Sequence, residues 1–167
     1  MKPVKSSTLQ IDEHLDFQQR MFVVRCIGML LLVACVIAAL AGLLGGNGPL
    51  AQGHVANGPG EVRYPRFTRY QMPTRFEFEV DTAAVGADTF DIVFEGEHAR
   101  EFTFEESMPE PDSVTAADDR IRYTFKVEPG VRQQVVLQGQ PESMGRLSGT
   151  AAVAGGAPMR IDSFVYP

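Results

Sequence analysis

Residues 26–44, CIGMLLLVACVIAALAGLL, form an apolar run of 19 residues without a charged side chain. As an α-helix this run would be ~28 Å long at about 1.5 Å per residue, close to the ~30 Å hydrocarbon core of a bilayer. Four further apolar residues, 21–24, precede it and are separated from it only by Arg25. The sequence therefore predicts one transmembrane helix over residues 21–44, after an N-terminal tail over residues 1–20.

The basic residues around this run predict its orientation. No Lys or Arg occurs from residue 26 to residue 62, whereas four precede the run: Lys2, Lys5, Arg20 and Arg25. Positively charged flanks stay in the cytoplasm. The tail is therefore predicted to be cytoplasmic, and the chain beyond residue 44 to lie on the outer side of the membrane.

Two processing events are alternatives to an uncleaved anchor. Ala39-Leu40-Ala41 resembles the small-x-small site at which a secretory signal peptide is removed. Residues 32–35, Leu-Val-Ala-Cys, match a bacterial lipoprotein box, in which Cys35 would carry the lipid. The run is longer than the ~7–15 residues of a signal-peptide core, and nine apolar residues would follow a lipidated Cys35. We therefore favour the uncleaved anchor over a secreted or lipidated envelope protein.

Residues 45–60, GGNGPLAQGHVANGPG, contain six glycines and two prolines. This composition is typical of a flexible linker. It separates the apolar run from residues 61–167, a segment of a common size for one domain.

From residue 61 onward, apolar and polar residues alternate with a period of two. Phe76, Phe78 and Val80 alternate with charged residues, a pattern typical of a half-buried strand. The expected strands lie near 61–70, 75–81, 90–95, 101–105, 120–127, 131–138, 147–154 and 158–166, with tight turns at Pro129-Gly130 and Gly155-Gly156.

The predicted fold class is one N-terminal transmembrane α-helix plus an all-β domain over residues 61–167. Its strands, about seven or eight in number, predict an antiparallel β-sandwich that is immunoglobulin-like in general shape. Residues 61–167 contain neither Trp nor Cys, so phenylalanines are expected to fill the core.

The composition of this domain excludes several classes of function. With 18 acidic and 11 basic residues, it lacks the basic surface that nucleic-acid binding requires. No G-x-S-x-G, H-E-x-x-H or P-loop motif occurs. His54 and His98 are interpreted as a linker residue and a surface turn residue. We predict no enzyme activity, no catalytic residue, no cofactor and no metal.

An acidic stretch leaves one alternative open. Residues 76–119 contain 14 acidic residues and one basic residue, Arg100. The carboxylates near residues 105–119 could form a calcium-dependent sensor site, although no D-x-D-x-D-G register is present. The charged outward faces of strands explain the same residues without a ligand.

Arginines and aromatic residues interleave just after the linker. The residues of this segment are Arg63, Tyr64, Arg66, Phe67, Arg69 and Tyr70. Guanidinium groups beside aromatic rings could contact lipid headgroups or an acidic partner surface. The alternative interpretation is an edge strand, as Pro65 suggests, whose arginines pair with the acidic strands that follow.

Small residues recur every four positions in the apolar run, at Ala34, Ala38, Gly42 and Gly46. Small side chains on one helix face allow a second helix to approach closely. These four residues are therefore candidates for packing against another membrane helix.

Several short motifs resemble a group of small bacterial single-pass membrane proteins with an N-terminal helix and a C-terminal periplasmic β domain. The motifs are AGLLGG at 41–46, GPL at 48–50, YPRF at 64–67, Arg69-Tyr70 and Pro73-Thr74. The resemblance implies a location in the bacterial inner membrane and an accessory role beside a multi-pass membrane protein. It supplies no catalytic residue.

These observations predict a membrane-anchored periplasmic interaction module. Its partners would be the lipid bilayer and a multi-pass membrane protein, and its role that of an accessory subunit of an inner-membrane complex. The alternatives are a membrane-tethered sensor domain that binds a ligand or an ion such as calcium, and a lipidated or secreted envelope protein.

Overall fold

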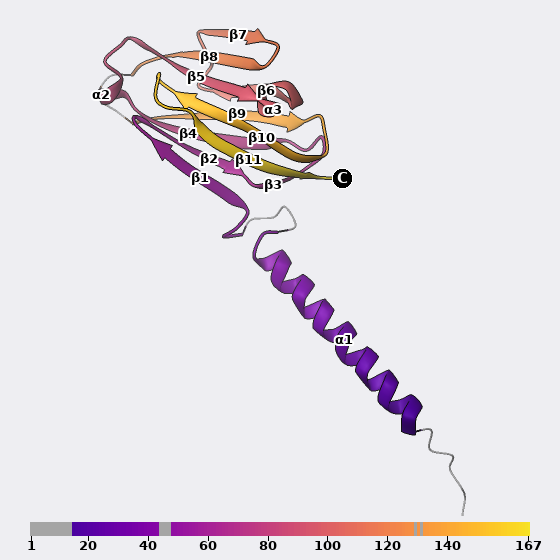
Figure 1. Cartoon of the computed structure of the whole chain (residues 1–167). Coiled ribbons are helices and arrows are strands. Elements are labelled where there is room, and N and C mark those ends of the chain that lie inside the picture. The colour runs from indigo at the N-terminus through magenta and orange to yellow at the C-terminus, as the bar shows by residue number, and fades with distance from the viewer. Residues whose placement is uncertain (1–14, 44–47, 129, 131) are drawn as a thin grey trace, which may run out of the picture. The chain divides into compact units, whose positions relative to one another are not determined.

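The computed structural model describes residues 15–43, 48–128, 130 and 132–167. The chain divides into two units, Met1–Ile37 and Ala38–Pro167. Figure 1 shows one long helix and a β domain. This arrangement confirms the predicted fold class of one apolar helix plus an all-β domain.

Helix α1 spans Leu15–Leu40, and its segment Gln18–Leu40 is long and apolar enough to cross a membrane. Its apolar side chains are exposed on all sides within the chain, and Leu30 and Leu40 are each 73% exposed. A helix that is apolar all round requires an apolar environment. One helix of this kind at the N-terminus fits a membrane span or a signal sequence.

Gly42 ends the helix. Its φ of 87° lies in the left-handed region that glycine adopts without strain. The Gly42 amide donates to the Ala39 carbonyl and the Leu43 amide to the Ala38 carbonyl, each at 3.0 Å, which is a Schellman motif. The helix therefore stops before residue 44, its predicted end.

This cap changes the interpretation of the small-residue stripe. Gly42 lies beyond α1 and caps it, so it does not belong to a helical stripe, and packing of the small residues on a second helix stays a prediction. Ala34 and Ala38 do lie in α1, four residues apart. Gly46 lies outside the described residues.

Two sheets make up the β domain. The five-stranded sheet has the order β1-β2-β4-β9-β6 and the six-stranded sheet has the order β3-β11-β10-β5-β8-β7. All pairs are antiparallel except β3 with β11. The bounds of the first sheet are Gln52–Asn57 (β1), Gly60–Pro65 (β2), Thr74–Asp81 (β4), Arg132–Pro141 (β9) and Phe102–Met108 (β6). Those of the second are Phe67–Arg69 (β3), Met159–Tyr166 (β11), Gly145–Val153 (β10), Thr89–Gly96 (β5), Arg120–Lys126 (β8) and Ser113–Ala117 (β7).

The expected linker over residues 45–60 is wrong in its second half, because Gln52–Asn57 form β1 and pair with β2. Two of its glycines serve close packing. A Cβ on Gly53 would lie 2.4 Å from the Tyr64 ring, and one on Gly60 would lie 2.5 Å from the Val153 side chain. Glycine here makes room for neighbouring side chains, which composition cannot distinguish from flexibility.

The single strand expected at 61–70 is two strands in different sheets. β2 ends at Pro65 and β3 begins at Phe67, so the chain changes sheets at Arg66. The Arg66 amide donates to the Ala51 carbonyl, and the Arg66 carbonyl accepts from the Phe164 amide, both at 2.7 Å. These bonds hold the crossing on both sides.

The turn expected at Gly155-Gly156 lies one residue earlier. Ala154 and Gly155 both have positive φ, of 51° and 71°, and the Gly156 amide donates to the Val153 carbonyl at 2.9 Å. The turn expected at Pro129-Gly130 includes Pro129, which lies outside the described residues.

Phenylalanines fill the core between the sheets, as predicted. Phe76, Phe78, Phe94 and Phe125 are each 0% exposed. The Phe76 ring meets those of Phe94 and Phe102 edge-on, at centroid distances of 5.6 and 5.4 Å. Edge-on packing is a favoured geometry for aromatic pairs.

Candidate functional site

His98 is a core residue, so its interpretation as a surface turn residue is wrong. It lies in helix α3 (Glu97–Glu101) and is 0% exposed. The Glu97 carboxylate accepts a hydrogen bond from the Ser148 amide at 2.6 Å, which holds α3 against β10. The imidazole then stacks on the Phe102 ring at 5.3 Å.

The hydrogen bonds around His98 show which ring nitrogen carries its proton. Ser163 Oγ donates to the Pro65 carbonyl at 2.9 Å, so it accepts from His98 Nε2, 3.3 Å away. His98 Nδ1 has no hydrogen-bond partner among the described residues. Burial lowers the pKa of His98 from 6.5 to about 4, against the opposing charges of Asp162 and Glu97. The imidazole is therefore neutral at pH 7 and structural in role.

The acidic stretch offers no ligand set in the described part of the chain, where no group of three or more His, Cys, Asp or Glu side chains could hold a metal. Several of its carboxylates have protein partners instead. Asp112 lies 3.0 Å from Lys126 Nζ, and Glu105 accepts from Gln140 Nε2 at 2.9 Å. The calcium-sensor alternative gains no support from these contacts.

The arginine and aromatic segment is divided by the change of sheet. Arg63 and Tyr64 lie on β2, Phe67 and Arg69 on β3, and Arg66 between them. Arg63 lies 3.1 Å from Glu61. Arg66, Arg69 and the nearby Arg75 are exposed and make no ion pair with any described residue. Pairing with the following acidic strands therefore does not account for these three arginines.

A hollow of about 400 Å³ brings much of this segment together. Four of the six predicted residues line it, namely Arg63, Tyr64, Phe67 and Arg69, whereas Arg66 and Tyr70 do not. Sequence reasoning missed Arg75 and Met72, which also line the hollow. Glu77 is the one acidic side chain in its lining. The hollow can hold an anionic group among three guanidinium groups.

The end of β11 adds aromatic rings beside this segment. In the parallel pair of β3 and β11, Phe67 lies opposite Phe164 and Arg69 opposite Tyr166. The Tyr166 ring lies 6.1 Å from the Phe67 ring and 5.0 Å from the Phe164 ring. Phe164 is 41% exposed. The two β11 residues were missed because they lie about a hundred positions away in the sequence.

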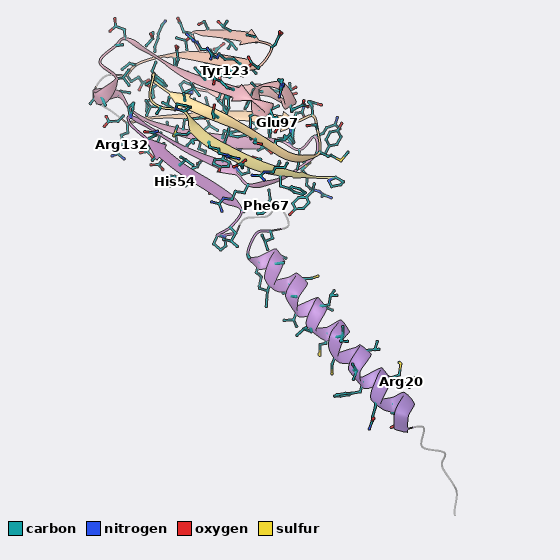
Figure 2. All side chains as sticks on the ribbon, in the orientation of Figure 1. Arg20, His54, Phe67, Glu97, Tyr123 and Arg132 are labelled. Atoms are coloured by element: carbon teal, nitrogen blue, oxygen red, sulfur yellow. The ribbon has the colours of Figure 1, made fainter. Side chains whose placement is uncertain are left out.

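A second hollow, of about 760 Å³, lies where β6 and β7 form the free edges of the two sheets. We call it the edge groove. Its apolar lining includes Phe104, Met108, Val114 and Tyr123. Met108 and Val114 are 75% and 52% exposed. Sequence reasoning missed this groove, because it depends on the order of the strands. Figure 2 shows Tyr123 and Phe67, one from each lining, in different parts of the domain, and Arg75 lines both hollows.

No protein-family model matches the chain, and no curated protein matches it. Among solved structures, the cohesin module of a Clostridium perfringens family 33 glycoside hydrolase is similar at 12% identity and a TM-score of 0.42, covering 66% of this chain and 98% of that chain. The cohesin of an OlpC cohesin–dockerin complex from Clostridium thermocellum has 6% identity and a TM-score of 0.39, covering 60% and 89%. AggA, the major subunit of Escherichia coli aggregative adherence fimbriae type I, has 17% identity and a TM-score of 0.35, covering 68% and 96%. No residue role passes from these proteins to this chain.

Proposed function

We propose that the chain is a membrane-anchored interaction module, an accessory subunit of a bacterial inner-membrane complex. In this proposal α1 is an uncleaved anchor, residues 1–20 are cytoplasmic and the β domain is periplasmic. The domain binds an extended segment of a multi-pass membrane protein in the edge groove. The observation that carries the proposal is the free edge of β6 beside an uncovered face of β7.

The two sheets overlap unequally at this edge. The Phe104 ring of β6 lies 4.7 Å from the Phe94 ring of β5 and 6.0 Å from the Tyr123 ring of β8. β6 therefore covers β5 and β8. β7 is the edge strand beyond β8 in the six-stranded sheet, and all five of its residues are exposed.

The uncovered face of β7 is apolar. Val114 lies opposite Tyr123 in the antiparallel pair of β7 and β8, so both side chains leave the sheet on the same side. Tyr123 is 7% exposed and packs in the core, whereas Val114 is 52% exposed. The position beside β6 and over Val114 belongs to the edge groove.

An added strand would use both the free edge of β6 and the apolar face of β7. It would hydrogen-bond to the free edge of β6 and place alternate apolar side chains on Val114 and Tyr123, which is recognition by strand addition. Glu105, Glu106 and Glu110 also line the groove, with Arg75 as the one basic residue. We therefore expect a partner segment in which apolar residues alternate with Lys or Arg.

Replacing Met108 by Arg is expected to abolish partner binding, since the charge enters the apolar part of the edge groove. Full-length protein would be isolated from native membranes in a mild detergent, with Met144→Arg as the matched control. Met144 is also exposed, at 58%, but does not line the groove. We expect at least tenfold less partner with Met108→Arg and an unchanged amount with Met144→Arg.

Amide hydrogen exchange of the isolated complex tests the binding mode. If the partner adds a strand to β6, the amides of Phe102–Met108 exchange more slowly in the complex than in the protein without its partner. Equal recovery of the partner by both arginine variants, or unchanged exchange in β6, would refute the edge-groove proposal. The intact mass of the same sample tests the anchor, because a chain beginning at Cys35 or after Ala41 is incompatible with it.

A further inference from the structure

We propose that the hollow lined by Arg63, Arg69 and Arg75, with the adjacent Arg66 and the neighbouring rings of Phe67, Phe164 and Tyr166, binds anionic phospholipid headgroups of the membrane that holds α1. We call this surface the basic aromatic face. The inference rests on the anchor part of the proposed function and needs no partner in the edge groove, although Arg75 lines both hollows.

The basic aromatic face lies close to the end of α1 along the chain. Ala51 and Gln52 line the hollow. The Leu50 amide donates to the Ala41 carbonyl at 3.1 Å, and Ala41 is the first residue after α1. A Cβ added to Gly42 would lie 2.8 Å from the Ala51 Cβ, so these two residues are packed together. The lining of the hollow therefore begins at the point where the chain leaves the apolar span.

Tyr166 provides a second, independent connection. Its hydroxyl donates to the carbonyl of Leu43, three residues beyond the end of α1. The Phe67 ring lies against Tyr166, and so does the Phe164 ring. Tyr166 therefore contacts the chain just beyond the apolar span, and amphipathic aromatic residues are enriched at membrane–water interfaces.

The charges of this face fit an anionic surface. Residues 63–75 contain four arginines and no acid, in a chain whose net charge is −6. Arg66, Arg69 and Arg75 have no carboxylate partner among the described residues, whereas Arg120, Arg122 and Arg132 are each paired. An unpaired guanidinium binds a phosphate group through two parallel hydrogen bonds. Anionic lipid headgroups supply such phosphates at the membrane surface.

The test uses full-length protein in nanodiscs of phosphatidylcholine, with or without 30% phosphatidylglycerol, and measures amide hydrogen exchange. With phosphatidylglycerol we expect exchange over residues 66–70 and 164–166 to slow at least threefold. Replacing Arg66, Arg69 and Arg75 by Gln is expected to remove this difference. The matched control replaces Arg120, Arg122 and Arg132 by Gln, which changes the net charge equally and is expected to keep it.

Three results would overturn the inference. The first is equal protection in the two lipid compositions, and the second is a loss of protection that is the same in both triple variants. The third is protection that appears only when a partner protein is present, which would assign the face to an acidic protein surface. Met108→Arg is expected to keep the lipid effect, so a failure of the edge groove is distinguishable from a failure of this face. Intact mass identifies a failure of the anchor.

Discussion

Lowering the pH from about 7.5 to 4.5 is expected to reduce the unfolding free energy of the wild-type domain by about 2–3 kcal/mol more than that of His98→Gln. Burial lowers the pKa of His98 from 6.5 to about 4 in the folded protein. Between these values the unfolded chain binds a proton that the folded chain does not. The contribution of neutral His98 to the unfolding free energy is therefore fully present above pH 6.5. It is lost as the pH falls from 6.5 to about 4.

Glutamine is a suitable replacement because it is neutral and its Nε2 can still donate to Ser163. Urea unfolding of full-length protein in a neutral detergent, followed by circular dichroism, gives the free energy at each pH. Comparing each protein with itself at the two pH values removes any constant cost of the substitution. His54→Gln serves as the control, since the His54 side chain is 56% exposed and pairs with Glu61 at the surface, and it should change the pH response much less than His98→Gln does. An unchanged pH response in His98→Gln would show that the imidazole is not the titrating group.

Replacing Phe76 by Ala is expected to destabilise the domain by about 3–5 kcal/mol, the usual range for a buried phenylalanine. Phe76 is 0% exposed and its ring meets those of Phe94, Phe102, Phe104 and His98. The rings around it come from β5, β6 and α3, so the remaining cavity cannot close by movement of one element.

The same urea experiment measures this effect, with Phe164→Ala as the matched control. Phe164 is 41% exposed at the end of β11, so its truncation in detergent is expected to cost less than about 1 kcal/mol. Similar losses in the two variants would contradict the assignment of Phe76 to the centre of the core.

The alternating pattern predicted most strands because each has one buried and one exposed face. The pattern Phe76, Phe78, Val80 appears unchanged in the burial of β4. The glycine-rich stretch suggested a linker, but Gly53 and Gly60 make room for Tyr64 and Val153, which lie on other strands or at the far side of a hairpin. The burial of His98 could not be predicted, since its partner Ser163 is 65 residues away.

The candidate surfaces also combine residues that are close in the sequence with residues that only the fold brings together. Arg63, Tyr64, Phe67 and Arg69 are close in sequence and could be selected from composition. The rings of Phe164 and Tyr166 join them only through the parallel pairing of β3 with β11. The edge groove has no local signal, because it arises from the position of β7 beyond β6 in the sandwich.

The hydrogen bond from Leu50 to Ala41 has a consequence for affinity. Only residues 41–51 separate α1 from β1, so a partner whose own helix packs on α1 would meet the edge groove as a tethered ligand. Short connections of this kind produce effective concentrations of about the millimolar order. A groove with a dissociation constant of roughly 100 μM for a free peptide would then be about nine-tenths occupied. Weak binding by the segment in solution is therefore compatible with a stable complex in the membrane.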